Sequence, residues 1–123
     1  MIRSVSVCDE DLASLYERFD ELAALPEGWL DGDGVPPKDV VVNRARSVLA
    51  DLLNQDVPRP RVFPTPGGGV QAEWTVGDHE ISVTFEPDGS LYAVSVNVAS
   101  GESSEPQLTA DDVAQIAELL RAS

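Results

Sequence analysis

The sequence has few of the side chains on which most enzyme mechanisms depend. His79 is its only histidine and Cys8 its only cysteine, so the chain can form neither an internal disulfide nor a metal site of several cysteines. A Ser-His-acid or Cys-His arrangement would have to include His79, which we expect to be a solvated residue beside a turn. A reactive Cys8 would need a nearby cation to favour its thiolate, and only Arg3 is close in sequence. We therefore expect no enzymatic activity, no catalytic residue, no metal and no cofactor.

Long apolar runs are also missing. No stretch approaches the ~20 apolar residues that a membrane helix needs, and residues 1–8 lack the apolar region of a secretory signal. We expect a cytoplasmic protein without membrane attachment. Its 123 residues, of which 42% are apolar, are enough for one domain with a real core.

Positive charge is scarce. Eight Lys and Arg residues stand against 22 Asp and Glu residues, which gives a formal net charge of −14. Between Arg61 and Arg121 there is no Lys or Arg, while ten acidic residues fall in that interval. We therefore expect no direct binding to nucleic acid, which requires phosphate neutralisation, or to an anionic membrane. The acidic surface serves either solubility or the docking of a basic protein.

The stretch from Val70 to Val98 organises the rest of the chain. Alternating apolar and polar side chains predict three strands, joined by tight turns, at residues 70–76, 79–86 and 91–98. A short edge strand at Val62-Phe63 precedes them, so that the meander covers residues 61–98. The side chains expected to face inward are Val70, Ala72, Trp74, Val76, Ile81, Val83, Phe85, Tyr92, Val94, Val96 and Val98.

Three segments have apolar residues at helical spacing, and they are residues 9–25, 37–54 and 109–121. Residues 2–7 would add an edge strand or stay loose. A meander with one apolar face needs a second layer. The sequence therefore predicts a single α+β domain over residues 1–123. In it, an antiparallel β-meander of three to four strands is packed on one face by two N-terminal helices and one C-terminal helix.

Three glutamates fall on the polar phase of the predicted strands. We expect Glu73, Glu80 and Glu86 to face solvent or a partner, away from the helices. The other polar residues expected on that face are Gln71, Thr75, Ser82, Thr84, Ser95 and Asn97. A flat, polar face without a base suits recognition better than catalysis.

The loop from Glu27 to Pro37 contains a tryptophan and two aspartates. We expect Trp29 to anchor the loop in the core, because burial of an indole is strongly stabilising; an exposed contact residue is the alternative. Asp31 and Asp33 invite a calcium interpretation, but the twelfth position counted from Asp31 is Val42 rather than an acid. A turn in which the aspartates bond local amides is the favoured interpretation.

Several segments resemble a set of small uncharacterised bacterial proteins with a Gly-Trp-Asp-Gly loop, a Gly-Gly-Val-Gln-x-Glu-Trp strand and a Pro-Asp-Gly turn. In this chain the segments are Gly28–Gly32, Pro36-Pro37, Pro64–Trp74 and Pro87–Gly89. Leu30 stands between Trp29 and Asp31, where the family usually has no residue. The resemblance covers roughly residues 12–96 and implies a bacterial origin and a fold. It implies no reaction, although small proteins of this kind are often accessory or antitoxin-like partners.

These observations predict a non-enzymatic acidic binding protein that docks a basic protein, for example an antitoxin, an inhibitor or an accessory subunit. The candidate partner-binding residues are Glu73, Glu80, Glu86, Trp29, Asp31 and Asp33. Two alternatives stay open: a small metal-dependent hydrolase that uses Asp31 and Asp33, and an acidic mimic of nucleic acid.

Overall fold

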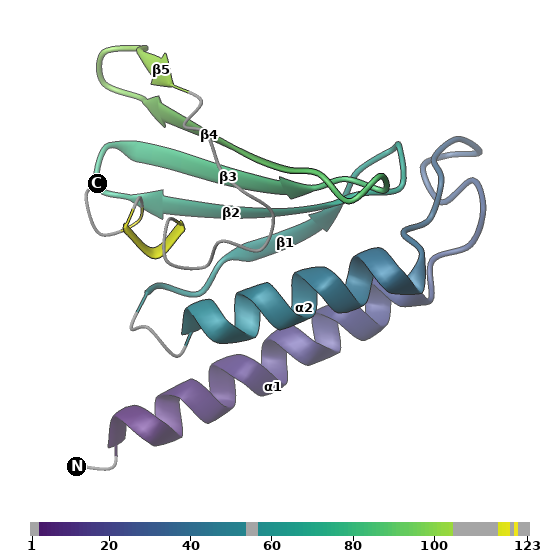
Figure 1. The fold of residues 1–123 in the computed structure, drawn as a ribbon, viewed down its shortest axis with the longest axis horizontal. Coiled ribbons are helices and arrows are strands. Elements are labelled where there is room, and N and C mark those ends of the chain that lie inside the picture. The colour runs from purple at the N-terminus through teal and green to yellow at the C-terminus, as the bar shows by residue number, and fades with distance from the viewer. Residues whose placement is uncertain (1–2, 54–56, 105–115, 119, 121–123) are drawn as a thin grey trace.

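A computed structural model of the chain describes residues 3–53, 57–104, 116–118 and 120, and for residues 3–12 it describes the backbone alone. Two long helices lie against an antiparallel sheet of five strands (Figure 1). In chain order the elements are α1 (Arg3–Ala23), α2 (Asp39–Leu53), β1 (Arg61–Pro64), β2 (Val70–Val76), β3 (His79–Phe85), β4 (Leu91–Asn97) and β5 (Ser103–Ser104). Each strand pairs with its neighbour in sequence. The predicted α+β class and antiparallel meander are confirmed.

The sheet has more strands than the three to four that we expected. β5 consists of Ser103 and Ser104, which pair with Val96 and Ser95 of β4. Two serines give no apolar alternation, so the sequence pattern predicts no strand at these positions.

Helix α1 begins six residues earlier than the expected start at Asp9. The alternation of Ser and Val before Asp9 had favoured a strand or a loose end. Extension of an existing helix adds one hydrogen bond for each residue fixed, and the propensity cost of Ser or Val is below about 0.7 kcal/mol each. The helix ends at Ala23, two residues before Leu25, whose position in front of Pro26 disfavours helical geometry.

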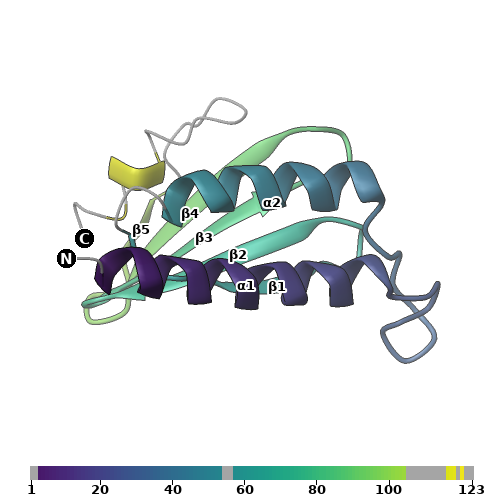
Figure 2. The same cartoon turned by 90° about the horizontal axis from the view of Figure 1, so that it is seen from below.

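Both helices lie on the same face of the sheet, side by side (Figures 1 and 2). Helix α2 packs directly on β2 and β3, whereas α1 packs mainly on α2 and meets the sheet at β1. The two N-terminal helices thus lie on one face of the sheet as predicted, but they differ in how much of it they contact. Because α2 contacts both α1 and the sheet, its buried stripe is wide and consists of Val41, Val42, Ala45, Val48, Leu49, Leu52 and Leu53.

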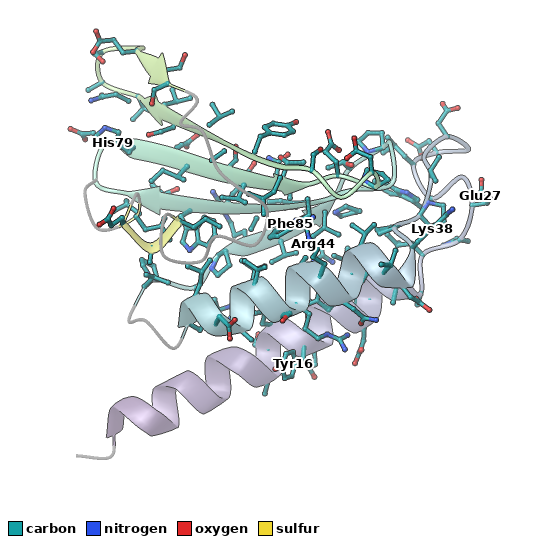
Figure 3. The ribbon with its side chains drawn as sticks, viewed as in Figure 1. Tyr16, Glu27, Lys38, Arg44, His79 and Phe85 are labelled. Atoms are coloured by element: carbon teal, nitrogen blue, oxygen red, sulfur yellow. The ribbon has the colours of Figure 1, made fainter. Side chains whose placement is uncertain are left out.

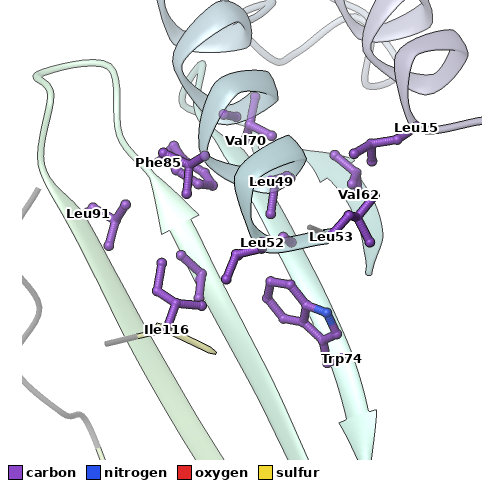
Figure 4. Packing of buried hydrophobic residues seen from close by; sticks show 14 of the residues in the cluster. Leu15, Leu49, Leu52, Leu53, Val62, Val70, Trp74, Phe85, Leu91 and Ile116 are labelled. Atoms are coloured by element: carbon purple, nitrogen blue, oxygen red, sulfur yellow. The ribbon is translucent and has the colours of Figure 1, made fainter. Parts of the chain in front are cut away.

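The buried apolar side chains of the described residues form one cluster between the helices and the sheet (Figure 4). Trp74, Phe19 and Phe85 are its largest fully buried members. Ile116, Ala117 and Leu120 belong to the same cluster, so the C-terminal segment contributes to the core. Most of the C-terminal helix predicted at residues 109–121 lies outside the described residues.

The strand register fixes which side chains face the helices. Val62, Ala72, Val83 and Ala93 form one row across four strands, and all four are buried. The predicted inward faces of β2 and β3 are confirmed, although Val76 is only partly buried.

The inward face predicted for β4 is wrong. Leu91, Ala93 and Ser95 face the core, and the alternate residues Tyr92, Val94 and Val96 face away from the helices. β4 has apolar residues on both phases, so alternation alone favoured the phase with more of them. The structure sets the phase through the turn, because Phe85 pairs with Leu91 and cross-strand partners point to the same side of a sheet.

That turn is a three-residue hairpin connection, Pro87-Asp88-Gly89. The amide of Glu86 donates to the carbonyl of Ser90 at 2.9 Å, and the amide of Gly89 donates to the carbonyl of Glu86 at 3.0 Å. Gly89 has a φ of 94°, which is the left-handed conformation expected at the third position of such a loop. This turn makes Leu91 the cross-strand partner of Phe85, and because Phe85 faces the core, Leu91 faces the core as well.

Candidate functional site

The side of the sheet away from α1 and α2 is the candidate site, and we call it the outer face. No described helix covers it (Figure 1). The β1–β4 side chains on this face are Arg61, Phe63, Gln71, Glu73, Thr75, Glu80, Ser82, Thr84, Tyr92, Val94 and Val96. Ser95 and Asn97, which we expected here, lie on the opposite phase. The outer face is therefore mixed in character rather than polar, with Phe63 and Tyr92 39% and 46% exposed.

Glu73 is held in place by its neighbours on the outer face. The amide nitrogen Nε2 of Gln71 donates to Glu73 Oε2 at 2.8 Å, and Arg61 Nη2 lies 3.5 Å from Glu73 Oε1. The carboxylate is about one-third exposed, so the two contacts orient it while one side stays open to solvent.

Glu80 lies on the neighbouring strand, diagonally across from Glu73. The register pairs Glu73 with Ser82 and Thr75 with Glu80, and such diagonal positions are about 7–8 Å apart. Glu80 is exposed, and no ion pair within the described part of the chain involves it. The structure therefore brings Glu73 and Glu80 together in the middle of the outer face.

Glu86 lies at the end of the sheet where β2 begins and β3 ends. It is partly buried, and its Oε1 is 3.3 Å from the position that a Cβ on Gly69 would occupy. Glu86 is thus separated from Glu80 by the length of β3 and forms one border of the outer face.

Asp31 and Asp33 lie on the tip of the loop between the helices. Leu30 and Asp33 exchange backbone hydrogen bonds of 2.7 and 2.8 Å, and Asp31 and Gly32 between them have φ values of 50° and 95°. Two successive residues with positive φ define the type I′ turn, which an Asp-Gly pair favours. Both aspartates are exposed. Among the described residues, no group of three or more His, Cys, Asp or Glu side chains could hold a metal ion.

Trp29 does not anchor in the core, contrary to our expectation. Its indole folds over its own loop, where Nε1 donates to the carbonyl oxygen of Val35 at 3.1 Å. The indole also packs on Gly34, where a Cβ would lie 3.0 Å from Nε1. The loop thus supplies its own packing for the ring, and Trp29 holds the loop closed.

This loop is attached to the sheet through Val35. Its amide donates to the carbonyl of Pro66 at 2.8 Å, and a Cβ on Gly68 would lie 3.3 Å from Val35 Cγ1 and 3.6 Å from Pro87 Cγ. Three connections therefore meet at one end of the sheet, and they carry most of the motif segments on which the family resemblance depends. Those motifs accordingly have a structural role at this end.

His79 lies at the opposite end of the sheet from Glu27 (Figure 3). It is partly buried and borders an open polar hollow of about 310 Å3 together with Ser95, Asn97 and Glu102. No hydrogen bond within the described residues joins His79 to these groups. His79 is therefore partly covered rather than fully solvated, as we had expected it to be.

A groove of about 590 Å3 between α1 and β1 was not anticipated from the sequence. Arg18, Arg59 and Arg61 line it. Arg18 pairs with Glu21 at 2.8 Å and donates from Nε to the carbonyl oxygen of Val62, also at 2.8 Å. Arg18 lies about 40 residues from Arg59 and Arg61 in sequence, which is why spacing did not reveal the groove.

The same contacts protect the edge of the sheet. Val62 directs its carbonyl away from β2 to accept the hydrogen bond from Arg18. Pro60 and Pro64, two residues away on either side, have no N–H to offer at this edge. Prolines and charged side chains on an edge strand prevent another chain from pairing with it. We therefore interpret the side chains that line this groove as protection of the edge strand β1.

Comparisons of the chain with protein-family models, with curated proteins and with solved structures find no match. No helix in the described part of the chain is both long and apolar enough to span a membrane. The resemblance to the small bacterial family therefore stays a prediction.

Proposed function

We propose that this chain is a non-enzymatic acidic binding protein that docks a basic protein through the outer face of its sheet. An antitoxin, an inhibitor or an accessory subunit would each act in this way. The observation that carries the proposal is the direction of Glu73 and Glu80, which lie on the side of the sheet that no described helix covers, with Glu86 at its border.

The charge of the chain supports a basic partner. The net charge is −14, and no Lys or Arg occurs from residue 62 to residue 120. Among the β1–β4 side chains of the outer face, Arg61 is the only cation, and Glu73 already neutralises it in part. A surface of one sign raises the association rate with a partner of opposite sign and disfavours wrong partners.

The positions of the loop residues give them a lesser role. Asp31 and Asp33 extend the acidic character to the loop tip, whereas Trp29 is engaged in holding that loop. We assign the main contact to the sheet carboxylates and an electrostatic contribution to the two aspartates.

The experiment is a capture of partners at low salt with the tagged chain, followed by measurement of the dissociation constant with the purified partner. We expect a basic partner whose affinity falls steeply between about 0.05 M and 0.5 M salt, because the Debye length falls severalfold over that range. Absence of any partner, or an affinity indifferent to salt, would contradict the proposal. If the captured partner is a DNA- or RNA-binding protein and its nucleic acid displaces it from the chain, the result would instead indicate an acidic mimic of nucleic acid.

A further inference from the structure

The outer face contains a small hollow in which carboxylates and aliphatic side chains meet. Its volume is about 90 Å3, or roughly three times the volume that one water molecule occupies in the liquid. The outer-face side chains that line it are Arg61, Glu73, Glu80, Ser82, Val94 and Val96. The hollow is thus the size of part of a single side chain.

The register explains the composition of this hollow. One row across the sheet is Glu73, Ser82 and Val94, and the next row is Thr75, Glu80 and Val96. The two glutamates are therefore diagonal neighbours on β2 and β3, while the two valines form a wall on β4. This wall exists only because β4 turns its valines away from the core.

We propose that the hollow receives a lysine or arginine side chain from an extended segment of the basic partner. The inference rests on the proposed function and specifies the partner's chemistry. Long cationic side chains bury their aliphatic stems against apolar surface and keep the charged group among polar ones. Val94 and Val96 contact the stem, and Glu73 and Glu80 bind the charged end.

The exposed aromatic side chains define what should accompany the cation. Tyr92 and Phe63 lie on the outer face one row beyond Glu73 and Val94, and both are more than one-third exposed. Successive rows are about 6.6–6.8 Å apart, the spacing of alternate residues in an extended chain. The partner segment should therefore carry an apolar side chain two residues from its Lys or Arg.

Charge complementarity selects this occupant over two others. A second copy of the chain placed on the same face would bring two sets of Glu73, Glu80 and Glu86 together, with a net charge of −14 on each copy. The chain's own residues 105–115 contain three acids and no Lys or Arg, so they carry the same sign as the site. A basic segment meets opposite charge and aliphatic surface together.

The test uses random linear peptides displayed on phage and selected against the intact chain. We expect the enriched peptides to pair a Lys or Arg with an aromatic or branched apolar residue two positions away. Addition of the leading synthetic peptide to the 15N-labelled chain should shift the amide signals of Glu73, Glu80, Ser82, Val94 and Val96. Enrichment of uncharged or acidic peptides, no enrichment, or shifts confined to α1 and α2 would overturn the inference.

Matched variants separate this inference from the proposed function. Val96→Thr keeps the branched shape that suits a strand but should weaken peptide binding by about fivefold or more; Val40→Thr, at an exposed position of α2, should leave it unchanged. Glu80→Gln should also weaken binding, whereas Glu118→Gln should not. If Glu80→Gln and added salt weaken binding but Val96→Thr does not, the basic-partner proposal survives and the hollow is not its site. If neither Glu80→Gln nor added salt weakens peptide binding, both the proposed function and this inference fail.

Sedimentation of the chain alone tests the competing occupant. We expect a monomer whose mass does not change when Val96 or Glu80 is substituted. A dimer that either substitution dissociates would show that a second copy covers the outer face and would overturn the inference.

Discussion

The indole Nε1 of Trp74 donates a hydrogen bond of 2.7 Å to the carbonyl oxygen of Pro58. The ring is 2% exposed and belongs to the central apolar cluster, so this bond ties the segment leading into β1 to the middle of β2. The second tryptophan, Trp29, makes an equivalent bond to Val35 at 3.1 Å in a loop outside the core. Both tryptophans thus donate a hydrogen bond to a backbone carbonyl, Trp74 from the apolar core and Trp29 from a loop outside it.

The two tryptophans should differ in their contribution to stability. Trp74→Phe leaves a cavity in the core and removes the hydrogen bond to Pro58, so we expect the free energy of unfolding to fall by about 2 kcal/mol. Trp29→Phe should cost about 1 kcal/mol or less, because solvent can satisfy the Val35 carbonyl. Urea denaturation followed by circular dichroism measures both, and equal losses would contradict the assigned positions.

Gly69 is packed against backbone, whereas Gly67 is open. A Cβ on Gly69 would lie 2.7 Å from the carbonyl oxygen of Phe85, and one on Gly67 would meet no atom within 4 Å. We expect Gly69→Ala to destabilise the protein by about 2 kcal/mol and Gly67→Ala to change stability by less than about 0.5 kcal/mol. The same thermal or urea unfolding experiment compares them. A tolerated Gly69→Ala would show that the two strands are not this close.

The β3–β4 turn should be sensitive to acid. Hydrogen bonds from the Ser90 hydroxyl, at 2.7 Å, and the Ser90 amide, at 2.9 Å, lower the pKa of Asp88 from its usual 3.8. A lowered folded-state pKa means that the stabilisation is present above pH 3.8 and is lost as the pH falls through the folded value. Carbon-13 NMR titration should show a pKa below 3.8 that rises toward 3.8 in Ser90→Ala. No response to Ser90→Ala would contradict the turn geometry.

Divalent cations should have no effect through the acidic loop. Asp31 and Asp33 are exposed on a two-residue turn, and no third acidic, histidine or cysteine ligand joins them within the described residues. We expect calcium, magnesium and manganese to leave Tm unchanged. A rise in Tm that disappears in the double variant Asp31→Asn, Asp33→Asn would support a metal-dependent enzyme instead.

The sequence predicted most of the core because periodicity and burial coincide there. The alternation in β2 and β3 is strict, and the helical stripe from Val41 to Leu52 has no competing pattern. A slip of one residue in β2 or β3 would expose the whole apolar set. These elements were therefore recovered with the correct inward faces.

The candidate site was predicted only in part, because its shape depends on turn geometry. Glu73 and Glu80 were placed on the outer face by alternation, but the valines beside them were assigned to the core. β4 is apolar on both phases, and the pairing of Phe85 with Leu91 through a three-residue turn decides between them. The structure of the loop around Trp29 likewise depends on backbone contacts with Gly34 and Val35 that have no periodic signal.

The most direct test of the acidic docking surface compares two triple variants of equal charge change. One is Glu73→Gln, Glu80→Gln and Glu86→Gln on the outer face, and the other is Glu17→Gln, Asp51→Asn and Glu118→Gln at exposed positions of the helical segments. Calorimetric titration with the purified partner at low salt should show a dissociation constant raised by about tenfold or more for the first variant and by less than about threefold for the second. Equal effects of the two variants, or no effect of the first, would contradict a docking surface on the sheet.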